Sequence, residues 1–360
     1  MEDIKKLVDE SVELLKKLIA TPSFSREEDR TAELILNFLT DHGIAASRSD
    51  NNVWAVNSRF DPDKPTILLN SHHDTVKPNP GYTRDPFLPE VIDGKLYGLG
   101  SNDAGGPLVS LMAAFIHFYH RTALNYNLVL AATAEEEISG KGGIEKLWPE
   151  LPTIAFAIVG EPSLGHMAVA EKGLLVLDCT VYGKAGHAAH QTGDNAIYKA
   201  LKDIEWFRTY RFGRVSETLG EVKMTVTVIE AGKQHNVIPA ECRFTVDVRV
   251  TDAYTLEEVI DEIRQHVSCD VKPRSVRLRS SGIPADHPLV QAANKLGIRT
   301  YGSPTTSDQA LIPLPSVKIG PGDSARSHMA DEFIYTDELK HGIHTYIDLL
   351  EELNRLLVKS

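Results

Sequence analysis

The feature that most constrains the fold is a set of continuous apolar segments, each of strand length. They lie at residues 66–70, 128–133 and 154–159, and a further short strand is expected at 317–319. Continuous rather than alternating apolar character is typical of strands that are buried on both faces. Helical patterns separate them, the clearest at residues 106–120. This order predicts an α/β fold, in which helices cover both faces of a sheet.

The middle of the chain has a different pattern. Between residues 242 and 250, apolar and polar side chains alternate, as expected for a sheet with one face in water. Helical patterns at 195–207 and 256–267 accompany it, and the earlier character returns after residue 283. We therefore predict an α/β domain formed by residues 1–175 and 284–360. An inserted α+β domain, residues 176–283, interrupts it.

Composition excludes several classes of protein. The net charge of −12 argues against a nucleic-acid or anionic-membrane binder, because both need an extended basic face. No run of about 18 apolar residues is present, and residues 1–20 read as an amphipathic helix, not as a signal peptide. Three cysteines without a CxxC pair indicate reduced thiols. A cytoplasmic protein without a nucleic-acid or membrane partner is expected.

Polar residues that could bind metal follow the apolar segments. His72 and Asp74 come directly after the first, in a pattern where a carboxylate can orient a metal-bound imidazole. Asp103 stands just before the predicted helix at 106–120. The alternatives are an ordinary polar loop for the first pair, and a helix N-cap for Asp103.

Three further candidates follow the later segments: the acidic run 135–137, Glu161 and His328. A solvated charge run, a turn residue and a loop histidine are the respective alternatives. Taken together, however, two histidines and several carboxylates suit Zn²⁺, Co²⁺ or Mn²⁺. A surplus of carboxylates fits a bridged two-metal site at the carboxyl ends of the strands.

In this order, the motifs resemble those of the co-catalytic metallopeptidase and deacylase family. That family includes acetylornithine deacetylase, succinyl-diaminopimelate desuccinylase, aminoacylase and glutamate carboxypeptidase. The resemblance implies two divalent metal ions, most simply Zn²⁺. Its implied metal ligands are His72, Asp103, Glu137, Glu161 and His328. Asp103 would bridge the ions, Asp74 would orient His72, and Glu136 would be the general base.

The resemblance also makes the inserted segment a lid that commonly mediates dimerisation. His187, in Gly-Lys-Ala-Gly-His, would polarise the scissile carbonyl, often across a homodimer. Asn236 and Arg249 match substrate-binding positions, and Arg249 would clamp a carboxylate. An ion pair on the wet face of the sheet is the alternative for Arg249. The sequence departs from the family in two places: Glu135 replaces the usual Asp, and no lysine follows Asp103.

The expected reaction is metal-dependent hydrolysis of an N-acyl amino acid, a small-molecule substrate. N-acetylornithine or an N-acylcitrulline of arginine biosynthesis is the leading expectation. Acyl-lysine deacetylation, succinyl-diaminopimelate desuccinylation, and a di- or aminopeptidase remain alternatives. A non-catalytic binding protein on the same scaffold is less favoured, because every expected site position is filled.

Overall fold

The computed structural model describes residues 2–190 and 192–358, and the chain divides into two compact units. Unit 1 comprises Met1–Val169, Gly282–Tyr301 and Ser307–Ser360, and unit 2 comprises Ala170–Ser281 and Gly302–Thr306. The domain limits at residues 176 and 283 stay a sequence-based prediction, and each unit is described by itself below.

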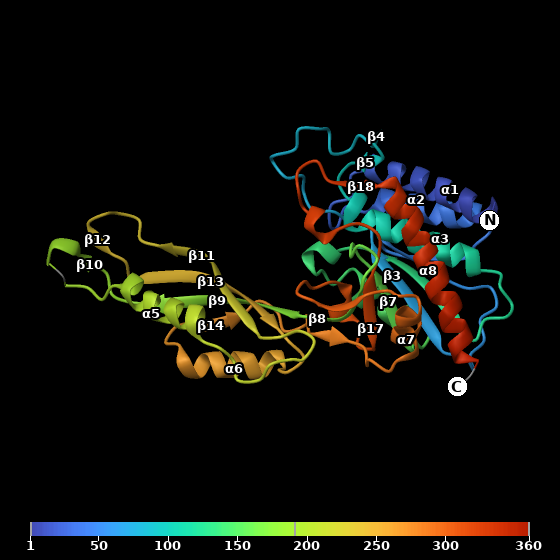
Figure 1. Cartoon of the computed structure of the whole chain (residues 1–360). Coiled ribbons are helices and arrows are strands. Elements are labelled where there is room, and N and C mark those ends of the chain that lie inside the picture. Colours follow the sequence, from blue (N-terminus) through green and yellow to red (C-terminus); the bar gives the residue numbers. More distant parts are fainter. Residues whose placement is uncertain (1, 191, 359–360) are drawn as a thin grey trace. The chain divides into compact units, whose positions relative to one another are not determined.

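The main sheet has nine strands, in the order β1-β2-β6-β3-β7-β17-β8-β15, with β16 paired to β8 (Figure 1). The strands are β1 Ala46–Ser49, β2 Asn52–Val56, β3 Thr66–His72, β6 Asn127–Thr133, β7 Phe156–Gly160, β8 Met167–Glu171, β15 Ser281–Gly282, β16 Thr300–Ser303 and β17 Ser316–Ile319. Strands β6, β3, β7 and β17 are mutually parallel neighbours. Their carboxyl ends therefore meet at one edge of the sheet.

Helices cover both faces of this sheet, as the sequence predicts. They are α1 Glu2–Ile19, α2 Asp29–Asp41, α3 Gly106–Phe118, α4 Ile144–Leu147, α7 Pro288–Lys295 and α8 Thr336–Leu357. Side chains of one strand alternate between the faces. Leu69 of β3 accordingly joins a core cluster with α3 and α8, whereas Leu68 joins a second cluster with α4. The α/β prediction is confirmed.

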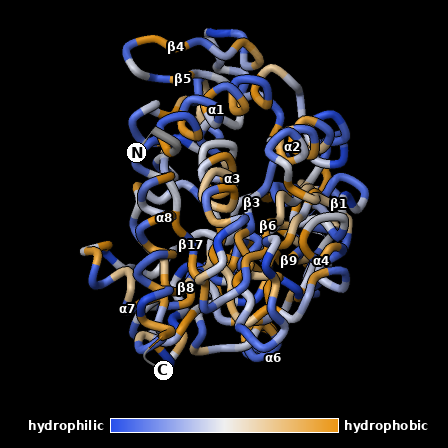
Figure 2. Tube along the Cα trace, turned by 90° about the vertical axis from the view of Figure 1, so that its right-hand side faces the viewer, coloured by the Kyte–Doolittle hydropathy of each residue, from blue (hydrophilic) through white to orange (hydrophobic). Residues whose placement is uncertain are grey.

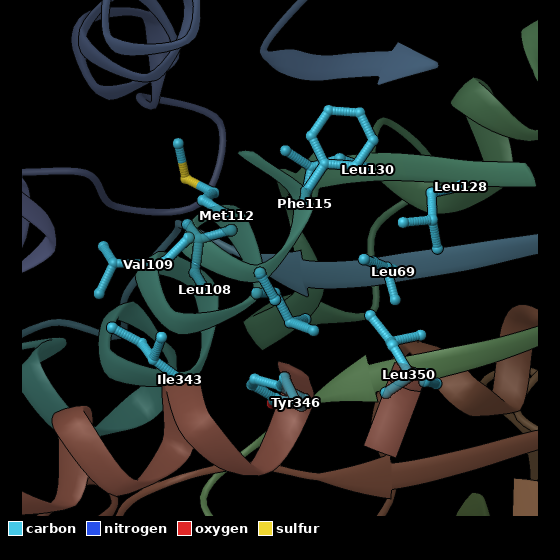
Figure 3. Packing of buried hydrophobic residues seen from close by; sticks show 14 of the residues in the cluster. Leu69, Leu108, Val109, Met112, Phe115, Leu128, Leu130, Ile343, Tyr346 and Leu350 are labelled. Atoms are coloured by element: carbon cyan, nitrogen blue, oxygen red, sulfur yellow. The ribbon is translucent and has the colours of Figure 1, made fainter. Parts of the chain in front are cut away.

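The larger core lies between the sheet and α3. No charged residue interrupts α3, and most of its side chains are buried. Figure 2 shows the hydrophobic colouring of this helix, next to β3 in that view. Phe115 and Met112 of α3 pack with Leu130 of β6 and Tyr346 of α8 in the same cluster (Figure 3). This packing fixes the strand ends, where the polar residues begin.

A small antiparallel sheet, β18-β5-β4, completes unit 1. Its strands are β4 Glu90–Ile92, β5 Lys95–Tyr97 and β18 Phe333–Tyr335. Within the described residues, no helix is both long enough and apolar enough to cross a membrane.

Unit 2 is built around an antiparallel sheet in the order β11-β13-β9-β14. Its strands are β9 Gly173–Tyr182, β11 Lys223–Ala231, β13 Glu241–Val250 and β14 Asp270–Pro273, and β10 Gly186–His187 pairs separately with β12 Val237–Ile238. Helices α5 Ala196–Thr209 and α6 Leu256–His266 contribute to its core. The alternation along β13 is confirmed, because Phe244, Val246 and Val248 are buried and face these helices' cluster.

Candidate metal centre

Four parallel strands deliver most of the candidate residues to one edge of the sheet. β3 ends on His72, the acidic run 135–137 follows β6, and Glu161 follows β7. The loop after β17 carries His328, whose φ of 61° places it in the left-handed region. Asp103 lies in a turn between β5 and α3. It is not the N-cap of α3, because Gly105 holds that position.

His72 is the centre of the arrangement, with a side chain that is 1% exposed. Its Nε2 lies 3.4 Å from Asp103 Oδ1, 3.7 Å from Glu161 Oε1 and 3.8 Å from Glu136 Oε2. No residue that the structure describes makes a hydrogen bond of normal geometry with this buried nitrogen. The nitrogen is therefore open to a ligand that the protein itself does not supply.

The other nitrogen of His72 is occupied. Nδ1 donates to the main-chain oxygen of Asp74 at 3.1 Å and lies 3.4 Å from the Asp74 carboxylate. These contacts place a proton on Nδ1 and direct Nε2 toward the carboxylates, the orientation of a metal-bound histidine. Asp74 also accepts hydrogen bonds from the main-chain N–H groups of Glu136 and Glu137, at 3.0 and 3.2 Å.

Asp103 lies between two imidazoles. Its Oδ1 faces His72, and its Oδ2 lies 3.6 Å from Nε2 of His328. His328 Nε2 is also 3.0 Å from Glu137 Oε2. One carboxylate can thus serve two neighbouring histidine sites, and each site has carboxylates of its own.

Burial and mutual repulsion perturb these carboxyl groups. Burial, then the charge of Asp103, raises the pKa of Glu161 to about 8. Burial also raises the pKa of Glu136 well above its usual value and raises that of Glu137. Burial alone would lower the pKa of His72, but Glu136 and the neighbouring aspartates raise it well above the usual value. Such a concentration of buried negative charge is typical of a site built for cations.

The donor set fits divalent metal ions. Two triplets of ligand atoms, His72/Asp103/Glu137 and His72/Glu136/Glu161, each lie within 4.8 Å of one another. Imidazole and carboxylate donors suit Zn²⁺, Co²⁺ and Mn²⁺. All seven predicted residues of unit 1 — His72, Asp74, Asp103, Glu136, Glu137, Glu161 and His328 — are thus brought together, while their individual roles stay predictions.

Sequence reasoning missed two buried acids beside the centre. Asp308 accepts a hydrogen bond from the Thr133 hydroxyl at 2.8 Å, and burial raises its pKa to about 6. Glu332 accepts from the main-chain N–H groups of Asn102 and Asp103, at 2.8 and 3.0 Å. Burial, then Asp103, raises the pKa of Glu332 to about 8. Both acids stand in short polar turns without periodicity, so only their nearness to apolar segments could have marked them.

The remaining predicted residues, His187, Asn236 and Arg249, belong to unit 2. His187 is in β10 and Asn236 directly precedes β12, and the main-chain oxygen of Asn236 accepts from Ala188 N–H at 3.0 Å. Arg249 forms two hydrogen bonds with Asp247, at 2.8 and 3.0 Å, and donates to Thr306 at 3.3 Å. The ion-pair alternative for Arg249 is therefore present, within its own strand rather than across strands.

Comparison with known sequences identifies the family. Residues 68–352 match the sequence profile of peptidase family M20/M25/M40. The chain belongs to this family. Family membership and the named relatives show that the protein is a metal-dependent amide hydrolase, as predicted. They favour an enzyme over the non-catalytic alternative.

Two similar sequences are named as deacylases with different substrates. Succinyl-diaminopimelate desuccinylase 2 of Ruegeria sp. (strain TM1040) is 30% identical over 275 residues, covering 71% of this chain and 69% of that protein. Acetylornithine deacetylase of Proteus mirabilis (strain HI4320) is 29% identical over 360 residues, covering 90% of this chain and 91% of that protein.

Solved M20 structures share the fold. The metallo-carboxypeptidase Sso-CP2 of Sulfolobus solfataricus superimposes with a TM-score of 0.77 at 17% identity, over 96% of this chain and 99% of that one. The aminopeptidase PepT of Bacillus cereus ATCC 10987 gives the same TM-score at 20% identity, over 97% of this chain and 98% of that one.

Proposed function

We propose that this M20 member removes the acyl group from an N-acyl amino acid, using two divalent metal ions. The observation that supports two ions is the placement of Asp103, with one carboxylate oxygen facing His72 and the other facing His328. His72, Asp103 and Glu161 would hold one ion, and Asp103, Glu137 and His328 the other. A relative in the fold, the Bacillus subtilis YXEP protein, is described as a dinuclear metal-binding peptidase. Zn²⁺ is the proposed metal, with Co²⁺ and Mn²⁺ as alternatives.

The proposed mechanism assigns the proton transfers to Glu136. Divalent cations bound at this site would lower the pKa of a water molecule and polarise the acyl oxygen. Glu136 would take the proton from the attacking water and deliver it to the leaving amide nitrogen. Asp74 would keep the Nε2 lone pair of His72 directed at the site. His187 would stabilise the oxyanion, either in its own chain or in a partner.

The proposed substrate is N-acetylornithine or an N-acylcitrulline, which would place the enzyme in arginine biosynthesis. Support comes from the Proteus mirabilis acetylornithine deacetylase, which aligns over nearly the whole chain. The α-carboxylate of the substrate would bind Arg249 in exchange for Asp247, with Asn236 as a further contact. N-acetyl-lysine is an alternative substrate, and so is N-succinyl-diaminopimelate, which the Ruegeria relative favours.

A panel of substrates tests this proposal. The chelator-treated protein is reloaded with Zn²⁺, Co²⁺ or Mn²⁺ and assayed on N-acetylornithine, N-acetylcitrulline, N-acetyl-lysine, their N-succinyl analogues and dipeptides. Release of free amino acid from the N-acyl compounds alone supports the proposal. Hydrolysis of dipeptides alone would favour the peptidase alternative, which the aminopeptidase PepT represents among the solved structures. Activity that survives complete metal removal would refute the mechanism.

We also propose a cytoplasmic homodimer, formed through unit 2. The three cysteines are free and buried, which suits a reducing compartment. β11 is at the edge of its sheet, where it pairs with β13 on one side. Val228 and Ile229 of β11, and Tyr198 and Leu201 of the adjacent α5, are exposed. An apolar edge of this kind is typical of an interface.

A further inference from the structure

The loop between α1 and α2 contacts the candidate metal centre, although it lies well before the centre's residues in the sequence. This loop, residues 23–28, joins α1 to α2 and is here called the N-terminal loop. Its Ser25 hydroxyl donates to Asp74 Oδ2 at 2.6 Å. Asp74 is fully buried, so each donor to its carboxylate contributes to holding the charged group in one orientation.

The same loop also contacts the acidic run after β6. Glu28 is 0% exposed, and its Oε1 accepts from the main-chain N–H groups of Arg26 and Glu135, at 2.6 and 3.2 Å. Its Oε2 accepts from Asn51 Nδ2 at 2.8 Å. The Ala134–Glu135 peptide, one peptide before that of Glu136, is thus held by a carboxylate more than a hundred residues earlier in the chain, while Asp74 holds the N–H of Glu136 itself.

The carboxylate of Glu28 bonds to loop residues and does not cap the helix at which it stands. It stands at the N-cap position of α2, but its side chain makes no capping hydrogen bond, and Glu is not among the residues that favour this position. Its buried carboxylate accepts from three separate segments instead, through Arg26 of its own loop, Asn51 and Glu135. This observation is independent of the Ser25 contact.

The loop is itself anchored to the strand end that carries the centre. Thr75 N–H donates to the Ser23 main-chain oxygen at 2.8 Å, and the Ser23 hydroxyl donates to the His73 main-chain oxygen. The Thr31 hydroxyl lies 2.9 Å from His73 Nδ1. With both ends of the loop fixed, Ser25 and Glu28 can transmit a defined position to their partners.

We propose that Ser25 and Glu28 are positioning residues of the metal centre: Ser25 orients Asp74, and Glu28 fixes the backbone from which Glu136 projects. Neither residue contacts His72 or the acyl group in this scheme. Ser25 acts through Asp74 on the metal-binding histidine, and Glu28 acts through the Glu135 peptide on the base. The inference rests on the proposed function of the site.

The Ser25 arm is tested with Ser25→Ala, with Ser25→Thr as the conservative variant and Ser58→Ala as a control hydroxyl outside the centre. Removal of the direct outer partner of a metal ligand, here Asp74, costs about 10–100-fold in metal affinity or activity, and Ser25 is one contact further out, so its removal should cost about tenfold or less. Ser25→Ala should therefore weaken Zn²⁺ binding in a chelator competition and lower kcat by up to about tenfold, with KM unchanged. The melting temperature of the metal-free protein should stay close to wild type, and Ser25→Thr should restore both properties.

The Glu28 arm predicts a different signature. Glu28→Ala should lower kcat while Zn²⁺ affinity changes less, because the base rather than a ligand loses its support. Glu28→Gln should be milder, since an amide oxygen can still accept from Arg26 and Glu135 N–H. Wild-type kcat and Zn²⁺ affinity in Ser25→Ala and Glu28→Ala would overturn the proposal, as would losses that only follow a fall in melting temperature. If the wild type cleaves no N-acyl amino acid, the proposed function fails, while the Zn²⁺ titration of Ser25→Ala still decides the Ser25 arm.

Discussion

At the scale of single residues, the candidate metal centre combines acids whose pKa values are shifted in opposite directions. Burial alone would raise the pKa values of Asp103 and Asp74, but the nearby His72 imidazole and the hydroxyl groups of Ser327 and Ser25, respectively, lower both. The pKa of Glu136 and that of Glu161 are raised, because burial dominates. Groups whose environments separate their pKa values in this way commonly differ in role, some as anions and some as proton carriers.

Glu136→Gln tests the proposed base directly. The amide keeps the size of the side chain but cannot take a proton from water, so kcat should fall by about 10²–10⁴-fold, the usual contribution of a general base. Bound metal, measured by elemental analysis, should stay at the wild-type level. Glu135→Gln, one residue earlier, is the matched control and should keep kcat close to wild type. A Glu136→Gln enzyme with near-wild-type kcat would remove Glu136 from the mechanism.

The buried acids also predict how the metal-free protein responds to pH. The pKa values of Glu161 and Glu332 are raised to about 8, so both groups favour the folded state while protonated. Their contribution is complete below the usual glutamate pKa and is lost as pH rises through about 8. The melting temperature of metal-free protein should therefore fall between about pH 5 and pH 8. Glu332→Gln should flatten this slope, and a melting temperature that rises over this range would contradict the assignment.

At the scale of elements, strands with several apolar residues were predictable from the sequence, and strands of two residues were not. β3, β6 and β7 are buried along their whole length and leave a largely continuous apolar signature in the sequence, whereas the buried β17 includes Ser316 and Lys318. β10 and β12 have two residues each, too few for any periodicity. Ser25 and Glu28 were not predictable either, for a different reason. Their hydrogen-bond partners are 49 and 107 residues away in the sequence, and only the fold brings each pair together.

The packing of α3 against the sheet supports the strand ends, and it can be weakened selectively. Phe115 is fully buried between α3 and the strands, and Phe115→Ala should cost about 3–5 kcal/mol of unfolding free energy. Chemical denaturation of the metal-free protein measures the loss. Ala substitution of the exposed Phe60 is the matched control and should stay within about 0.5 kcal/mol. An equal loss in both variants would show that this core does not carry the stability.

The proposed homodimer can be tested at the exposed edge strand β11. Val228→Glu combined with Ile229→Lys places charge on the exposed apolar edge and should shift the protein from dimer to monomer in light scattering after size-exclusion chromatography. Val276→Glu, at another exposed apolar position of unit 2, is the control and should leave the mass unchanged. An undisturbed dimer in the double variant would place the interface elsewhere, and a monomeric wild type would remove the proposal.

At the scale of the whole molecule, the metal centre draws on segments from residue 72 to residue 328. Metal binding should therefore stabilise unit 1 as a whole, by about 2.7 kcal/mol when free metal is at 100 times its dissociation constant. Titration of the chelated protein with Zn²⁺ should restore full activity and the higher melting temperature at two ions per chain. Saturation of both properties at one ion per chain would contradict a bridged pair.

The sheet order also has a consequence for how the chain is made. β17 lies between β7 and β8, although all of unit 2 is synthesised before residues 316–319 appear. Until then β7 can pair with β3 on one side, but its other side has no partner strand. All residues of β7 are buried in the finished protein. An uncovered apolar edge invites pairing with other chains. The growing polypeptide is thus most exposed to aggregation on the ribosome during the whole time in which unit 2 is being produced, and a chaperone that shields β7 would act in that interval.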